Sequence, residues 1–162
     1  MKKTLFNEGY YFSKNVVDMD HIDLSAMEKV VLPHTWNKDD GQDGGNDYYR
    51  GKCYYVRQFE KPELNEEELW IEFEAVAMSA EVYLNGKLLG KHEGGYSTFR
   101  VNLTEDLKDD NLLVISADNS QNQRVYPQSA DFTFYGGIYR DVYLLRVPKL
   151  HFQLGHYGSS AV

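Results

Sequence analysis

Short runs in which apolar and polar residues alternate recur along this sequence, and they constrain the fold more than any other feature. In the segment Trp-Ile-Glu-Phe-Glu-Ala (residues 70–75), the apolar Ile, Phe and Ala share one face of an extended strand. Glu72 and Glu74 point the other way, which predicts a half-buried antiparallel strand with both glutamates in solvent. The sequence shows no apolar period of 3.6 residues sustained over a dozen positions. It therefore predicts an all-β domain.

A tight hairpin is predicted at residues 81–90. The run Glu-Val-Tyr-Leu meets Asn85 and Gly86, a dipeptide that favours a type I′ turn because both central residues take positive φ. Residues 104–107 are expected to form one helical turn with Thr104 as its cap. Further strands are expected at residues 53–59, 98–103, 112–117 and 138–147. Many short strands separated by turn residues predict a β-sandwich or jelly roll.

The length and charge of the chain limit its organisation and its partners. A chain of 162 residues suits one domain. We expect residues 1–150 to form it and residues 151–162 to be the truncated start of a following segment. A net charge of −8 argues against nucleic acid and anionic membranes, which bind clustered Lys and Arg. Polar residues follow Lys2 and Lys3 where a signal peptide would be apolar, and no run approaches the ~18 apolar residues of a membrane span. We therefore expect a cytoplasmic protein.

Metal and thiol chemistry find little support in the sequence. Cys53 is the only cysteine, and its apolar neighbours favour a buried, inert thiol. An acidic, glycine-rich loop offers oxygen ligands at Asp39, Asp40, Asp43, Asn46 and Asp47. Counting from Asp39, however, Gly41 takes the third position and Arg50 the twelfth, so an EF-hand loop does not fit. The five histidines show no zinc spacing. We expect a solvated loop, no metal and no cofactor in this chain.

Catalytic machinery is not expected either. Nucleophile signatures such as Gly-x-Ser-x-Gly are absent from the sequence. A retaining glycosidase needs two carboxyl groups ~5–5.5 Å apart, and no such pair can be chosen from spacing; Glu72 and Glu74 are better explained as a solvated face. His34 is expected to be a hydrogen-bonded structural histidine. We therefore assign no catalytic residue to this chain.

An ordered set of motifs runs through roughly residues 5–150. It comprises Leu-Pro-His-Thr-Trp-Asn (32–37), Tyr-Arg-Gly (49–51), Val-Tyr-Leu-Asn-Gly (82–86), Gly-Lys-His-Glu-Gly-Gly-Tyr (90–96), Asp-Asn (118–119) and Gly-Gly-Ile-Tyr-Arg-Asp-Val (136–142). The set resembles the N-terminal domain of family 2 glycoside hydrolases, and most of all that of the β-galactosidases. One motif would be a weak signal, but the ordered set is specific.

The resemblance implies a jelly-roll, galactose-binding-domain-like fold, called the sugar-binding domain in that family. There it packs against an immunoglobulin-like domain and a (β/α)₈ barrel that holds both catalytic glutamates, and the full enzymes can use Mg or Na ions. A barrel needs ~250 residues, more than this chain has. The resemblance thus implies a non-catalytic part of an enzyme that hydrolyses terminal β-galactosides, inactive alone, with carbohydrate and the downstream domains as partners.

The resemblance also assigns single residues. An Asp shortly before the Gly-Ile-aromatic-Arg-Asp stretch reaches the active site in β-galactosidases, and Asp131 occupies that position. A carboxylate that accepts hydrogen bonds from sugar hydroxyls suits this role. Phe132 is expected to make docking contacts, and Arg140 to pair with a carboxylate or with backbone carbonyls. Gly136 and its neighbour are expected to permit a bend or bulge.

Two other classes of function stay open. A free-standing carbohydrate-binding module would show an exposed row of aromatic side chains, for which the candidates are Tyr48, Tyr49, Tyr54 and Tyr55. A purely structural domain would bind no sugar, and the loss of the Asp131 carboxylate would then affect stability alone.

Overall fold

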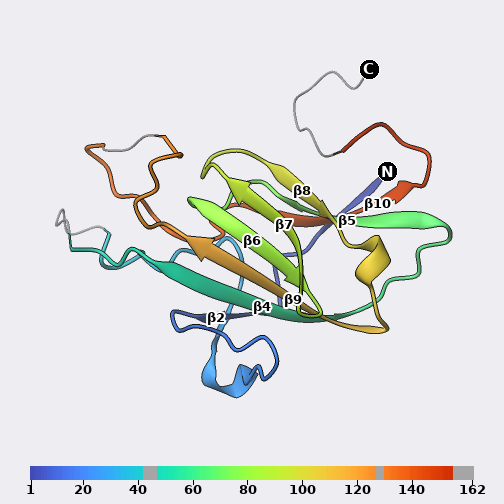
Figure 1. Cartoon of the computed structure of the whole chain (residues 1–162), viewed down its shortest axis with the longest axis horizontal. Helices are drawn as coiled ribbons and strands as arrows, with labels where there is room; N and C mark the ends of the chain where they lie inside the picture. The colour runs from blue at the N-terminus through green and yellow to red at the C-terminus, as the bar shows by residue number, and fades with distance from the viewer. Residues whose placement is uncertain (42–46, 127–129, 155–162) are drawn as a thin grey trace.

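Two antiparallel sheets pack face to face and bury the core between them (Figure 1). The structure, a computed structural model, describes residues 1–41, 47–126 and 130–154. Its strands are β1 Lys2–Leu5, β2 Tyr10–Ser13, β3 Glu28–Val30, β4 Lys52–Glu60, β5 Glu67–Phe73, β6 Ser79–Leu84, β7 Lys87–Glu93, β8 Phe99–Asn102, β9 Asp110–Asp118 and β10 Val142–Pro148. Two 3₁₀ turns, η1 Leu24–Ala26 and η2 Thr104–Asp106, complete the elements.

The strand order explains how distant segments meet. The four-stranded sheet has the order β1-β10-β5-β8, and the six-stranded sheet has the order β3-β2-β4-β9-β6-β7. The first and last strands of the described residues, β1 and β10, pair antiparallel in the smaller sheet. The prediction of an all-β jelly-roll sandwich is confirmed. None of the helical turns in the described residues has the length and apolar character needed to cross a membrane.

The predicted hairpin is confirmed in its detail. Strands β6 and β7 pair antiparallel and meet at Asn85 and Gly86, whose φ angles are +53° and +84°. The side chain of Asn85 also accepts a hydrogen bond from the backbone N–H of Leu112 at 3.0 Å. The turn is therefore fixed both by its own backbone preference and by a contact to β9.

The predicted start of one strand and one predicted helix cap were wrong, and tertiary contacts explain both. Strand β10 begins at Val142 rather than 138, because the carbonyl of Ile138 accepts from the backbone N–H of His34, in a loop, instead of from a neighbouring strand. Thr104 does not cap η2; its hydroxyl accepts from the N–H of Leu69 at 3.0 Å and so ties the turn to β5.

The core consists of aliphatic and aromatic side chains from both sheets. Tyr10, Tyr55, Phe73, Ile115 and Leu145 are among its largest fully buried members. The buried thiol was predicted correctly: Cys53 is fully buried, and burial raises the pKa of its thiol to about 12. A thiol in this setting stays protonated near neutral pH and is not a nucleophile.

Glu72 overturns the prediction of a solvated glutamate face. Its side chain is only 4% exposed and accepts hydrogen bonds from Lys3 Nζ at 2.7 Å and from Arg100 Nε at 2.6 Å. Strands β1 and β8, which carry these cations, lie on either side of the β10–β5 pair. Burial opposes ionisation, but the two cations outweigh it and lower the pKa of Glu72. The alternating sequence gave no sign of this because the partners are distant in the chain.

Replacing Glu72 by Gln should lower the free energy of unfolding by about 2 kcal/mol at neutral pH, because Lys3 and Arg100 lose a buried charged partner. The folded pKa is depressed, so this stabilisation is present above the ordinary carboxyl pKa of ~4.3 and is lost as pH falls through the folded value. Urea unfolding of both proteins across acid and neutral pH measures the difference, which should shrink in acid.

Glu74→Gln is the matched control. The Glu74 side chain is 35% exposed and lies 3.9 Å from Lys3, so its loss should change stability by less than about 0.5 kcal/mol. Equal effects of the two substitutions, or a Glu72→Gln effect that does not vary with pH, would contradict the buried network.

Candidate functional site

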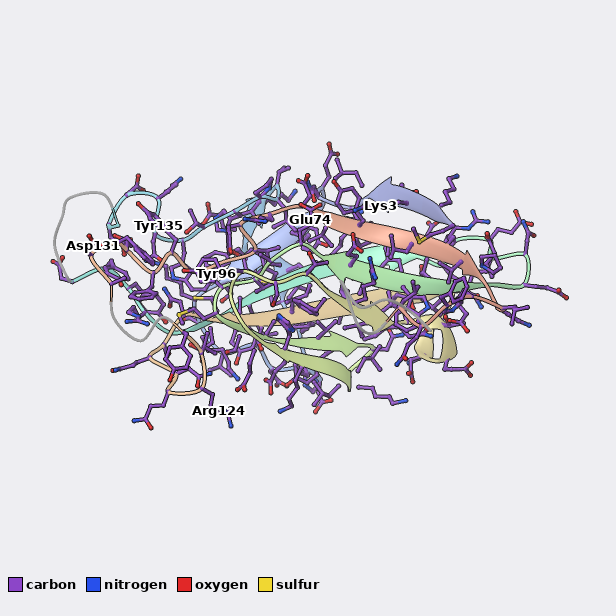
Figure 2. All side chains as sticks on the ribbon, turned by 90° about the horizontal axis from the view of Figure 1, so that it is seen from above. Lys3, Glu74, Tyr96, Arg124, Asp131 and Tyr135 are labelled. Carbon is purple, nitrogen blue, oxygen red and sulfur yellow. The ribbon has the colours of Figure 1, made fainter. Side chains whose placement is uncertain are left out.

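The loops that connect the strands gather at one end of the sandwich. Figure 2 shows Asp131 and Tyr135 at this end, with Tyr96 close by, whereas Lys3 lies far along the molecule. The segments that form this end are residues 34–41, 47–51, 76–78, 94–98, 119–126 and 130–141. Asp131 itself is exposed. The structure therefore brings the sequence-predicted binding residue to a surface built by several loops.

Two buried asparagines hold these loops together. The side-chain oxygen of Asn37 accepts from the N–H of Gly136 at 2.8 Å, and its amide donates to the carbonyl of Tyr49 at 2.9 Å. The side chain of Asn119 accepts from the N–H of Gly51 at 2.8 Å and donates to the carbonyl of Phe134 at 2.8 Å. Both asparagines are fully buried, and their amides lie 3.3 Å apart. They satisfy backbone groups that no strand pairs.

The glycine pair Gly136-Gly137 lets the segment after Asp131 lie against the 34–36 loop. A Cβ at Gly136 would lie 1.9 Å from Cζ2 of Trp36, and a Cβ at Gly137 would lie 2.3 Å from the carbonyl oxygen of His34. Gly137 also has a φ of +135°, which other residues rarely adopt. The predicted bend is present, and close packing on Trp36 requires it as much as backbone conformation does.

Trp36 belongs to the core rather than to a docking surface. Its side chain is 7% exposed and stacks on Phe12 with ring centres 5.9 Å apart. The indole N–H points to the carbonyl of Tyr49 at 3.4 Å. Trp36 therefore forms the floor on which Gly136 rests.

A small aromatic pocket adjoins the Asp131 segment. It has a volume of about 300 Å³, and its lining is mostly apolar. Its walls are formed by Thr35, Ala77, Met78, Tyr96, Phe132, Thr133, Phe134, Tyr135 and Tyr139. Tyr96 and Phe132 are 55% and 51% exposed, so aromatic surface is available at its rim. Pockets of this kind, apolar with a few polar groups beside them, are typical of small-ligand sites.

The rim of the pocket is tied to the loops around it. The hydroxyl of Tyr139 donates to the carbonyl of Gly95, beside Tyr96. The hydroxyl of Tyr135 donates to the carbonyl of Gly41 at 3.2 Å, and the hydroxyl of Thr133 donates to the same oxygen at 2.8 Å. The pocket is therefore held from several sides before any ligand binds.

The acidic loop is only partly described, and residues 42–46, which include Asp43 and Asn46, lie outside the described residues. Asp40 has a structural task, because its carboxylate accepts from the N–H of Tyr49 at 2.9 Å and from the amide of Asn37 at 3.1 Å. The hydrogen bond from Tyr49, above all, lowers the pKa of Asp40. Among the described residues, no group of three or more His, Cys, Asp or Glu is placed to hold a metal.

His34 and the tyrosine candidates occupy structural positions. Nδ1 of His34 lies 2.8 Å from the hydroxyl of buried Tyr55, and burial lowers the pKa of His34, so this histidine is structural, as predicted. The hydroxyl of Tyr48 accepts from the N–H of Phe134 at 3.1 Å. Tyr54 is half-buried, and only Tyr49 is exposed, at 37%. The exposed aromatic row of a free-standing binding module is therefore not formed by these tyrosines.

The predicted pairing of Arg140 is not present in the described part of the chain. Arg140 is exposed, and its guanidinium carbon lies 5.9 Å from the centre of the Tyr139 ring. Asp141 instead accepts from the side-chain amide of Asn7 at 2.8 Å and from the hydroxyl of Tyr143 at 3.1 Å.

Sequence reasoning missed the roles of Asn37, Asn119 and the pocket residues. Both asparagines stand inside the quoted motifs, but nothing in a sequence shows that two amides far apart in the chain meet. Tyr96 and Tyr139 also stand within motifs. An asparagine at the end of a motif is the one sequence signal that indicates loop anchoring.

Comparison with known proteins gives the family. Residues 18–148 match the model for the sugar binding domain of glycosyl hydrolases family 2, and the chain belongs to that family. A β-glucuronidase of Bacteroides fragilis is 40% identical over 83% of the chain, and a β-galactosidase of Thermoanaerobacter pseudethanolicus is 28% identical over 90%. The solved structure of Bacteroides uniformis β-glucuronidase 2, covalently bound to cyclophellitol-6-carboxylate aziridine, superposes with a TM-score of 0.89 at 38% identity over 98% of the chain.

The chain is similar to one part of these relatives. It spans 20% of the length of the Bacteroides fragilis protein and 19% of the length of the other two. The predicted boundary of the domain at residue 150 stays a prediction, beside a family match that ends at residue 148.

Replacing Gly136 by Ala should lower the free energy of unfolding by about 3 kcal/mol, because the new Cβ would overlap the Trp36 ring. Gly95→Ala is the control, since a Cβ there would meet Met78 and Ala77 at ordinary contact distances of 3.5–3.6 Å. Denaturant unfolding of both variants measures the difference. Equal, small effects would mean that the close packing of this loop on Trp36 does not contribute to stability.

Proposed function

We propose that this chain supplies one wall of the sugar site in a family 2 glycosidase that hydrolyses terminal β-glycosides, and that it carries out no hydrolysis alone. One observation carries the proposal: Asp131, the residue assigned by resemblance, lies exposed on the same loop as the aromatic pocket, in a segment anchored by Asn37 and Asn119. A carboxylate beside aromatic surface suits a sugar, whose hydroxyls need acceptors and whose C–H faces pack on rings.

The sugar is a β-glucuronide or a β-galactoside. The β-glucuronide ranks first, because the β-glucuronidases compared above are 38–40% identical to the chain and the β-galactosidase is 28% identical. The β-galactoside is the class that the motif resemblance favours. The Asp131 carboxylate can accept hydrogen bonds from ring hydroxyls, which both sugars carry, so its role does not depend on the choice.

The rest of the polypeptide completes the site in this proposal. The chain spans about a fifth of the length of its relatives, and a catalytic barrel alone needs ~250 residues. The exposed ring of Phe132 is the surface on which downstream domains would dock. Two carboxyl groups ~5–5.5 Å apart would then come from those domains.

Asp131→Ala in the product of the whole gene should lower kcat/KM by on the order of 2–4 kcal/mol in transition-state free energy, because a charged hydrogen bond to the sugar is lost. Stability should change little, because the residue is exposed. Steady-state kinetics with 4-nitrophenyl β-D-glucuronide and 4-nitrophenyl β-D-galactoside measure the loss and identify the sugar.

The matched control is Asp109→Ala, an exposed aspartate next to the start of β9, at the opposite end of that strand from Asn119. It should leave kcat/KM unchanged. An unchanged kcat/KM for Asp131→Ala would remove the substrate role of Asp131. Sugar release by purified residues 1–162 would contradict the non-catalytic role.

A further inference from the structure

The outer face of the six-stranded sheet carries a second and larger hollow, on the side of the sandwich away from Lys3. Its volume is about 740 Å³, within the ~300–1,000 Å³ range of small-ligand sites. The strand register places one row of floor residues across four neighbouring strands. Lys52 on β4 lies opposite Asp118 on β9. Ser79 on β6 lies opposite Asp118 on one side and opposite Glu93 of β7 on the other. Because side chains alternate along a strand, the residues two positions further on share this face.

The second row of the floor is Ser116, Glu81 and Lys91. The Glu81 carboxylate accepts from Lys91 at 2.5 Å, Lys52 at 3.1 Å and the Tyr83 hydroxyl at 3.0 Å. These bonds, that from Lys91 first, lower the pKa of Glu81 to about 2. The carboxylate therefore stays ionised and holds both lysines in place, so a ligand does not have to order this part of the floor.

The loop after β9 forms the wall. Its start is fixed by the N–H of Ser120, which donates to Asp118 at 2.8 Å, and Arg124 pairs with Glu93 from across the hollow. Val125 is buried in a small apolar cluster with Phe134 of the Asp131 segment. Figure 2 shows Arg124 on the opposite side of the sandwich from Lys3. The wall is thus anchored at both ends.

The charges of the hollow balance. Its three basic side chains, Lys52, Lys91 and Arg124, each pair with a carboxylate, either Glu81 or Glu93. A site of this kind has no excess charge with which to select an anion or a metal ion. No large apolar side chain of the described part of the chain lines it, so these residues offer no anchor to a protein partner.

Hydrogen-bonding groups remain available along the wall and floor. Among the described residues, the side chains of Gln121 and Gln123 on the wall, and of Ser79 on the floor, make no hydrogen bond to the protein. Each lysine ammonium has three N–H groups and gives one to Glu81. Donors and acceptors are therefore both available on this concave surface.

We propose that this hollow binds a neutral oligosaccharide through hydrogen bonds to the Gln121 and Gln123 amides and the two lysine ammonium groups. Sugar hydroxyls donate and accept at once, which matches a mixed lining of balanced charge. Binding is weak, because none of the described residues that line the hollow is a Phe, Tyr or Trp on which a sugar could stack. The site is distinct from the Asp131 pocket and does not depend on the role proposed for that residue.

The test is a titration of ¹⁵N-labelled residues 1–162 with cellotriose and with maltotriose, followed by amide chemical shifts. At least one of these neutral trisaccharides should give saturable shifts in residues 116–124. The double variant Gln121→Ala/Gln123→Ala should weaken its binding about five-fold or more, because two hydrogen bonds are lost. Lys91→Met should also weaken it, whereas triGalacturonate, an anionic trisaccharide, should bind no better than the neutral ones.

Gln58→Ala is the matched control, an exposed glutamine on β4 that lines a different surface hollow. It should leave the affinity unchanged. The proposal is overturned if neither neutral trisaccharide gives saturable shifts, if the shifts centre on residues 130–139, or if the double glutamine variant binds as tightly as the parent. Tighter binding of triGalacturonate would identify an anion site and would also overturn it.

Discussion

The buried amides of Asn37 and Asn119 are the interaction on which the functional end of this domain depends. A β-sandwich supplies its strands with backbone partners, but the loops at its ends must find partners elsewhere. Here two side chains reach the backbone of residues 49, 51, 134 and 136 and also meet each other. The cost of leaving any of these buried groups unpaired, about 1–3 kcal/mol, makes the arrangement specific.

The hydrogen bonds of Asn37 and Asn119 that stabilise these loops also fix the position of the segment that follows Asp131. The Trp36 ring packs so close to Gly136 that no residue with a side chain would fit there. The N–H of Gly136 donates a hydrogen bond to the side chain of Asn37. Asp131 precedes this anchored stretch by a few residues and stays exposed. The sandwich therefore presents a carboxylate and an aromatic pocket from a loop of limited freedom, which is how rigid scaffolds commonly carry binding residues.

Sequence reasoning predicted the parts of this molecule that depend on local chemistry. The Asn85-Gly86 turn, the strand at residues 53–59 and the buried Cys53 all follow from neighbours in the chain. The environment of Glu72 could not be predicted, because Lys3 and Arg100 are brought to it by strand pairing. The motif resemblance gave the family and a candidate residue, but the pocket beside Asp131 and the hollow above Glu81 arise only when loops and strands from distant segments meet.

Hydrogen exchange at the backbone amides of Gly51 and Gly136 measures directly whether the two buried asparagines hold these loops. Both residues lie in loops, and both amides donate to a buried asparagine at 2.8 Å. We expect both amides to exchange as slowly as amides of β4 and β9, and we expect Asn37→Ala to accelerate exchange at Gly136 selectively. Exchange as fast as that of an exposed loop amide such as Lys38 would show that the asparagines do not hold this end of the molecule.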